Sequence, residues 1–254
     1  MDNVNLKERL GEKTNAAETS ENTAVVPINN GYSMLTKKAL EIINENLKNQ
    51  PLSYQLFDVI KSPSGENIAF TIPGISGDDI AKELTGIIID YTTPRAYWDT
   101  PDPKIGTPPI CFSKDSITSV TEGKPCAHCP HNDFGSKNGE TNAKACKESV
   151  QILLLRPKSI IPVIVRVPVS SKILFQKYMI RLLGKLIPLS GTVTKITLER
   201  AVSKTGQPYP TFKFEAAEAL NDDTAATAKA FGQKFRDILN ISEAPVVLDI
   251  QEAE

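Results

Sequence analysis

The apolar positions of this chain fall mostly into short runs, the pattern of a β-rich fold. Residues 86–91, 150–155 and 160–167 are apolar almost throughout, as strands buried on both faces are. Residues 191–200 alternate apolar and polar side chains, and residues 209–214 return after a Lys-Thr-Gly-Gln turn as the antiparallel partner. Shorter strands are expected over 54–60 and 67–72.

Three longer segments place apolar residues at helical spacing, namely 34–49, 172–183 and 223–239. Ser170 and Ser171 precede the second segment, and they predict the N-terminal cap of that helix. The side chains of this helix that are expected to pack inward are Ile173, Leu174, Tyr178, Ile180 and Leu182. A further short helix is expected over 80–84.

Six or seven mostly antiparallel strands, with helices between and after them, predict a β-rich α+β fold. The strand number and the hairpin spacing favour an antiparallel barrel of the oligonucleotide-binding kind (OB-like), with helical caps. Residues 31–240 then form a single domain with an insertion at about 107–148. Residues 1–30 are polar and without hydrophobic period, which predicts a disordered tail, and 241–254 form a short acidic tail.

The insertion contains all four cysteines of the chain, Cys111, Cys126, Cys129 and Cys146, and both of its histidines. Cys126 and Cys129 form a Cys-x-x-Cys pair, which offers two sulfurs to one metal ion. Four sulfurs fill the tetrahedral coordination of zinc and leave no open position, so the sequence predicts a structural zinc site. Such an ion would also order a segment of about 35 residues that has few apolar side chains of its own.

Other interpretations of these residues stay open. His128 or His131 could replace Cys111, the most distant ligand, or lie on the surface of the metal module. Two disulfides are disfavoured because the chain lacks a signal peptide, which indicates the cytosol. A thioredoxin-like redox pair is disfavoured because loop-forming residues follow Cys129. A catalytic zinc needs an open position and a carboxylate, for which Asp133 is the close candidate.

The formal net charge of −1 hides an uneven distribution of charge. Residues 151–219 carry eleven basic and three acidic side chains, so this segment is about +8 and the remainder about −9. Segregation of this kind makes a positive field on a nearly neutral protein, which is typical of a binding site for a polyanion. An ordinary solvated surface is the plainer explanation, and eleven against three weighs against it.

Aromatic and basic side chains follow the strand at 86–91, where stacking on bases and contact with phosphates can combine. The same aromatic residues could form the rim of the core instead, since Trp is usually largely buried. The candidate nucleic-acid-binding residues are Tyr91, Arg95, Tyr97, Trp98, Arg156, Lys158, Arg166, Lys177, Arg181, Lys195, Tyr209 and Lys213.

Three runs of sequence are distinctive. They are Cys-Ala-His-Cys-Pro-His-Asn-Asp-Phe-Gly-Ser at 126–136, Lys-Ala-Cys-Lys-Glu at 144–148 and Pro-Val-Ser-Ser at 168–171. Together with the strand at 192–198, these runs resemble a family of phage and mobile-element proteins of bacteria, over roughly 111–214. The resemblance implies a single-stranded DNA-binding protein of DNA replication or recombination, acting in the bacterial cytoplasm. Better-known phage single-strand binders end in a long acidic tail, and the end of this chain is only modestly acidic.

The basic segment and the aromatic residues together predict binding of single-stranded DNA, or of RNA, without sequence preference. An enzyme is not expected, because the chain has no Walker glycine loop, no Gly-x-Ser-x-Gly and no His-Glu-x-x-His. The rival interpretation is a zinc-containing protein-interaction module that docks a replication protein or a host factor. Duplex DNA is disfavoured because no recognition helix is evident. A membrane is not expected as a partner, since no apolar run approaches the roughly 18 residues that cross a bilayer.

Overall fold

The structure is a computed structural model. It describes residues 25–28, 32–35, 41–42, 45–48, 56–100, 103–104, 107–137, 142–203 and 206–240. The chain divides into two compact units, of which the first comprises Met1–Pro51 and Pro157–Ile160 and the second Leu52–Arg156 and Ile161–Glu254.

The first unit contains a β-hairpin in which β1 (Val25–Ile28) pairs antiparallel with β2 (Tyr32–Leu35). Strand β1 lies inside the segment that the sequence predicts as a tail, and β2 occupies the start of the helix predicted over 34–49. Of that helix, residues 41–42 and 45–46 are helical. Residues 1–24, 29–30 and 241–254, the remainder of the two predicted tails, lie outside the described residues.

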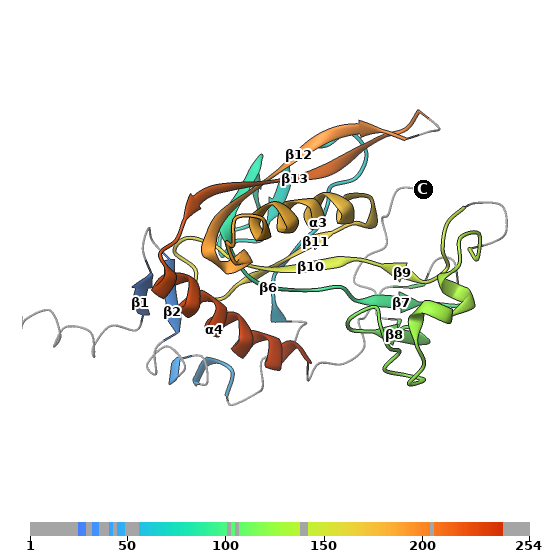
Figure 1. Cartoon of the computed structure of the whole chain (residues 1–254), viewed down its shortest axis with the longest axis horizontal. Coiled ribbons are helices and arrows are strands. Elements are labelled where there is room, and N and C mark those ends of the chain that lie inside the picture. The colour runs from blue at the N-terminus through green and yellow to red at the C-terminus, as the bar shows by residue number, and fades with distance from the viewer. Residues whose placement is uncertain are drawn as a thin grey trace, which may run out of the picture. The chain divides into compact units, whose positions relative to one another are not determined.

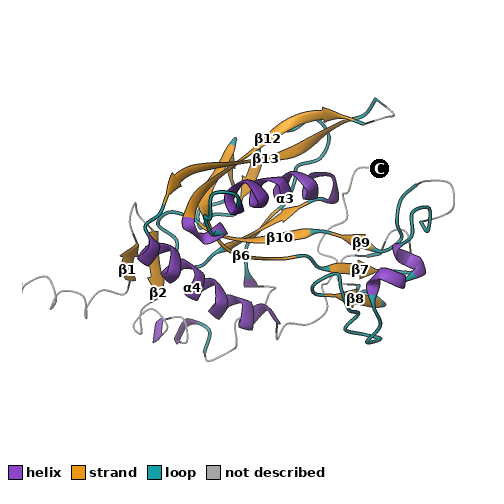
Figure 2. Ribbon diagram, viewed as in Figure 1, coloured by secondary structure: helices purple, strands orange, loops and turns teal. Residues whose placement is uncertain are grey.

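The second unit is a mixed α+β structure built on a six-stranded sheet, as Figures 1 and 2 show. Its strands in spatial order are β13 (Pro208–Ala219), β12 (Thr192–Val202), β6 (Glu83–Thr92), β10 (Val150–Leu155), β11 (Val163–Val167) and β3 (Val59–Ile60). All neighbours pair antiparallel except β11 and β3, which pair parallel. The predicted β-rich α+β class is confirmed, and the sheet is not closed into a barrel by strand pairing between its edges β13 and β3.

Each face of this sheet is covered by a helix. Phe175, Tyr178 and Leu182 of α3 (Val169–Leu183) belong to the core cluster on one face. Arg236 of α4 (Asp222–Asn240) binds Asp90 of β6 on the other face, with Nε 2.6 Å from the carboxylate. The central strands are therefore buried on both sides, which explains their unbroken apolar runs.

A β-bulge in β6 interrupts the regular alternation of side chains between the two faces of the sheet. Ile88 belongs to the core beneath α3, whereas Asp90 faces α4, although residues two apart in a regular strand share a face. The pairing with β10 shifts register at this point and leaves Ile89 as the extra residue.

Gly232 of α4 lies against this bulge, and we expect Gly232→Ala to destabilise the protein. A Cβ at this position would lie 2.1 Å from the carbonyl oxygen of Ile89, which is backbone and cannot rotate away. Overpacking costs about 1–3 kcal/mol, more than the gain of about 1 kcal/mol in helix propensity. Denaturant unfolding measures the loss, with exposed Gln233→Ala as a control expected within about 0.5 kcal/mol. An unchanged midpoint for Gly232→Ala would contradict the packing of α4 on β6.

A small hairpin, β4 (Phe70–Ile72) with β5 (Asp79–Ala81), closes over the same core as α3. The ring of Phe70 meets that of Phe212 of β13 edge-on, with the centroids 5.6 Å apart. The helix predicted over 80–84 is wrong, because this segment ends β5 and begins β6. Pairing with neighbouring strands decided the outcome against the local pattern.

Helix α3 begins earlier than the sequence predicts and without the expected serine cap. Its N-cap residue is Pro168, which makes no side-chain capping hydrogen bond. Ser171 is buried instead, and its Oγ accepts a hydrogen bond from the backbone N–H of Phe212 at 3.0 Å. The serine therefore ties α3 to strand β13.

The central ribbon of the sheet continues into a separate small sheet (Figure 1). Strand β6 is followed by β7 (Arg95–Tyr97), and β9 (Lys147–Glu148) precedes β10, so β7 and β9 pair in the same antiparallel sense as β6 and β10. Strand β8 (Cys111–Ser113) adds to the outer side of β7. Residues 98–146, which we call the cysteine module, connect β7 to β9 and contain all four cysteines.

Candidate functional site

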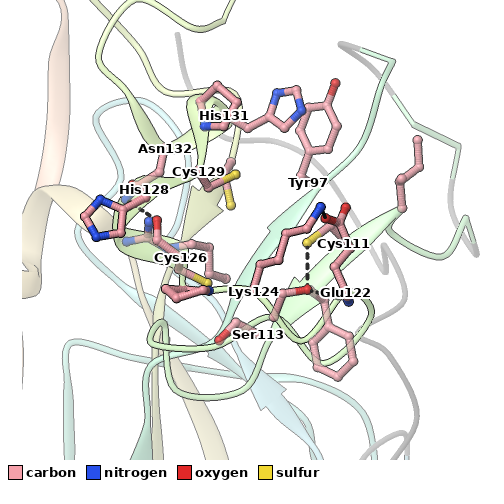
Figure 3. Close-up of a pocket in the computed structure, with 17 residues that line it drawn as sticks. Tyr97, Cys111, Ser113, Glu122, Lys124, Cys126, His128, Cys129, His131 and Asn132 are labelled. Atoms are coloured by element: carbon pink, nitrogen blue, oxygen red, sulfur yellow. Dashed lines mark hydrogen bonds and ion pairs between the residues drawn. The ribbon is translucent and has the colours of Figure 1, made fainter.

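All four cysteines line one cavity of about 380 Å³ in the cysteine module (Figure 3). All four are free thiols; Cys126 and Cys146 are buried and Cys111 and Cys129 are partly buried. The cavity brings together cysteines that lie up to 35 positions apart in the chain, as the zinc prediction requires.

The small sheet places two of the cysteines. Tyr97 pairs with Cys111 on β8, and Arg95 pairs with Glu148 on β9. One further step along the β7–β9 register sets Cys146 opposite Tyr97, so Cys111 and Cys146 flank the same tyrosine. Residues opposite each other, or two apart along a strand, share a face. The two cysteines and Arg95 therefore face the same side, on which the cavity lies.

Two consecutive 3-10 turns place the other two cysteines. They are η2 (Cys126–His128) and η3 (Pro130–Asn132). The side-chain amide of Asn132 donates to the carbonyl of Cys126 at 3.0 Å and braces the Cys-x-x-Cys turn from inside. The backbone N–H of Cys146 donates to the carbonyl of His131 at 2.8 Å, which holds the turns against the start of β9.

The two histidines have different surroundings. The ring of His131 stacks on the ring of Tyr97, with the centroids 3.8 Å apart and the planes 14° from parallel. His128 is exposed, and its ring points away from the sulfur atoms in Figure 3. As alternative metal ligands, His131 would have to leave its stack and His128 would have to turn inward.

The donors at this cavity fit zinc in number and chemistry, although the side chains are not in coordinating positions. No group of three or more His, Cys, Asp or Glu side chains among the described residues is arranged to hold a metal ion. Burial raises the pKa of Cys146 to about 12, with the other three cysteines adding to the rise and Arg95 opposing it. A cation beside Cys146 would favour its thiolate form.

The buried cation beside this cavity supplies a second sign of fit. Arg95 is 8% exposed, and two of its nitrogen atoms, Nε and Nη1, are buried without a hydrogen-bond partner among the described residues. Buried N–H groups are rarely left unpaired. Thiolates round a metal ion would accept these hydrogen bonds.

The candidate nucleic-acid residues are spread over several surfaces. Lys177 and Arg181 are exposed on α3, four positions apart, and neither has an ion-pair partner among the described residues. Tyr91 is 36% exposed, and its ring meets the ring of Phe175 of α3 edge-on at 5.2 Å. These three candidates lie on or beside one helix.

The basic candidates on β12 and β13 are neutralised by acidic neighbours. Lys195 pairs with Glu215 at 3.2 Å, and Lys213 pairs with Glu215 at 3.1 Å and with Glu199 at 3.3 Å. The hydrogen bonds from Lys213 and Lys195 lower the pKa of the Glu215 carboxyl. The hairpin surface is therefore mixed in charge rather than basic.

The remaining candidates are less accessible or lie elsewhere. Arg95 is buried and Trp98 donates from Nε1 to the carbonyl of Thr107 at 3.1 Å. Tyr97 is engaged with His131, as described above. The other partly buried candidates are Arg156, Arg166 and Tyr209. Lys158 is exposed and belongs to the first unit, so it is not placed relative to the others.

Sequence reasoning missed the apolar part of the exposed side of α3. Ile173 and Ile180 were expected to pack inward, and they are 54% and 65% exposed. The inward stripe is Ser171, Phe175, Tyr178 and Leu182, at spacings of four, three and four residues. Choosing Phe175 rather than Ile173 as the anchor of the helical period would have found this arrangement. Val169, Leu183 and Leu186 are exposed as well.

Comparisons with known proteins give no family: no family model matches the chain, no curated protein matches it, and no solved structure matches it. Of the helices that the structure describes, none has the length and apolar character to cross a membrane.

Proposed function

We propose that this protein binds single-stranded DNA without sequence preference and that the strand lies across the exposed side of α3. The observation that carries the proposal is the uncompensated positive charge there. Lys177, Arg181 and Lys185 are all exposed, and no ion pair involves them among the described residues. Together with exposed Ile173 and Ile180, we call these residues the α3 face.

The mixture of charge and apolar surface on the α3 face suits an unpaired strand better than a duplex. Each basic side chain near a phosphate releases counterions, which supplies affinity without reading sequence. A single strand also exposes the flat faces of its bases, which bind aromatic and apolar side chains, whereas a duplex stacks them inside. The ring of Tyr91, beside α3, adds a stacking surface.

The finer description of the fold that we propose is a half-open OB-like barrel. Ile60 of edge strand β3 and Phe212 of edge strand β13 belong to one core cluster, although the strands do not pair. Phe70 of β4 belongs to the same cluster and lies against Phe212. The hairpin β4–β5 and α3 would thus cover the gap between the edges, as capping elements do in barrels of this kind.

We further propose that Cys111, Cys126, Cys129 and Cys146 hold a zinc ion with a structural role. Four thiolates leave no coordination position for a substrate, so the ion would have no catalytic role, in keeping with a binding protein rather than an enzyme. The ion would order the cysteine module, which has few buried apolar residues among those described. Single strands are exposed during replication and recombination of phage or mobile-element DNA in a bacterial cell, and we place the function there.

A titration of labelled oligo-dT and of a matched duplex, each at two salt concentrations, tests the proposed function. We expect tighter binding of oligo-dT, with an affinity that falls steeply as salt rises. Absence of oligo-dT binding in dilute buffer would overturn the proposal, as would equal affinity for the duplex. Oligo-U in the same assay separates RNA from DNA. A salt-insensitive partner captured by the α3 face would favour protein docking instead.

Tyr91→Ala should weaken oligo-dT binding, because base stacking on an aromatic ring contributes about 1–3 kcal/mol. That range corresponds to a loss of about 5-fold to about 150-fold in affinity. Tyr209→Ala, on the charge-neutralised hairpin, is the matched control and should bind normally. Fluorescence anisotropy measures both. Equal losses in the two variants would argue against stacking beside α3.

A further inference from the structure

We infer that Arg95 is the internal counter-charge of the cysteine cluster, a positioning residue whose unpaired N–H groups hydrogen-bond the metal-bound sulfurs. The inference rests on the proposed zinc site and adds to it a residue outside the ligand set. Arg95 also connects the cysteine module to α3 through Glu148.

The side chain of Arg95 places two N–H groups beside the cavity of the four cysteines. It lies on β7 between Ser113 of β8 and Glu148 of β9, and its Nη2 donates to Glu148 at 2.8 Å. Its Nε and Nη1 are buried without partners among the described residues, and its side chain lines the cavity of the four cysteines. An unpaired buried donor costs about 1–3 kcal/mol, so an acceptor within the cavity would stabilise the protein.

Charge gives an independent reason. A zinc ion with four thiolates carries two net negative charges, and a cluster of that charge in a buried place needs a nearby cation. Among the described cations that line the cavity, Lys124 is exposed and pairs with Glu122 at 3.0 Å. Arg95 is buried and lines the same cavity.

The same guanidinium connects the cluster to α3. Glu148 accepts hydrogen bonds from Arg95 through one carboxylate oxygen and from Lys172 of α3 through the other. A continuous chain of charged contacts therefore runs from the cysteine cavity through Arg95 and Glu148 to the first turns of α3.

Metal competition with a chromophoric chelator, and the absorption spectrum of the Co²⁺-loaded protein, test the role of Arg95. Loss of a residue that hydrogen-bonds the ligands typically lowers metal affinity 10–100-fold, and we expect this for Arg95→Gln. The sulfur-to-cobalt charge-transfer band should shift as well, because hydrogen bonds to sulfur change its donor strength. Arg95→Lys, which keeps the charge, should recover part of the affinity. Lys104→Gln is the control, because this exposed lysine belongs to the cysteine module and does not line the cavity, and it should leave affinity and spectrum unchanged.

Arg95→Gln leaves Glu148 with one cation fewer and could fail to fold for that reason alone. The double variant Arg95→Gln/Glu148→Gln removes both charges and keeps the balance, and it should show the same loss of affinity and the same spectral shift. A folded double variant with wild-type affinity and an unaltered cobalt spectrum would overturn the inference while leaving the zinc site standing. Wild-type protein that binds neither Co²⁺ nor Zn²⁺ would overturn both.

Discussion

Serine in place of Cys126 is expected to abolish tight zinc binding and to unfold the cysteine module without unfolding the six-stranded sheet. The free energy of binding for structural zinc is on the order of 10–16 kcal/mol, and in small modules this is folding free energy. The buried hydrophobic residues described within 98–146 are Phe112, Cys126 and Cys146, whereas the core beneath α3 lies in the main sheet. The damage should therefore stay local.

Elemental analysis of the purified protein and hydrogen exchange measure this outcome. Wild-type protein should carry one zinc ion per chain, because the four proposed ligands complete the coordination of a single ion. The Cys126→Ser variant should lose it, with faster exchange confined to the cysteine module. His128→Ala is the matched control, because His128 lies in the same turn and is not a proposed ligand. Retention of metal by Cys126→Ser together with its loss in His128→Ala would contradict the four-cysteine assignment.

Neutralising Lys177 and Arg181 together is expected to weaken oligo-dT binding roughly 25-fold at about 0.1 M salt, because each phosphate contact to a single strand contributes about 0.7 to the salt slope. The slope itself should become shallower by about 1.4. Neither side chain has an ion-pair partner among the described residues, so removing the charges leaves no acidic group unpaired there.

The control for this prediction is Lys195→Gln/Lys213→Gln, which removes the same charge from β12 and β13. These lysines are already paired with Glu199 and Glu215, so their contribution to phosphate binding should be small. Anisotropy titrations across salt concentrations compare the two double variants. Equal losses would mean that net charge, and not the α3 face, governs binding.

Sequence patterns predicted the parts of the fold that depend on local periodicity. The hairpin of β12 and β13 is confirmed, with Ile196 opposite Phe214 and Leu198 opposite Phe212, all four in the core. Alternation was informative here because the opposite face of this hairpin is polar, so each side chain had one suitable side.

Other features depended on partners that a sequence does not reveal. The segment at 80–84 became strand because β4 and β12 were there to pair with it. The inward stripe of α3 was misjudged because the helix has apolar residues on both sides, so periodicity alone did not choose Phe175 over Ile173. Likewise, no pattern shows that Lys195 would meet Glu215 across the hairpin.

The position of the candidate metal site was the most predictable feature of the protein, whereas the side chains that surround the cysteines were the least predictable. Convergence of the four cysteines on one cavity agrees with the spacing argument, and zinc itself stays a prediction. Arg95, assigned from sequence to phosphate binding, lies buried beside that cavity because β7 extends the central ribbon underneath it. Only the register of the small sheet reveals this.

Photo-crosslinking with a single strand that carries 5-bromouracil tests the central claim most directly, because it reports where the strand lies. The account predicts crosslinked peptides from residues 169–185, which are lost when unlabelled oligo-dT competes and reduced in the Lys177→Gln/Arg181→Gln variant. Crosslinks confined to β12 and β13 or to the cysteine module, or no crosslinks at a saturating strand concentration, would contradict it.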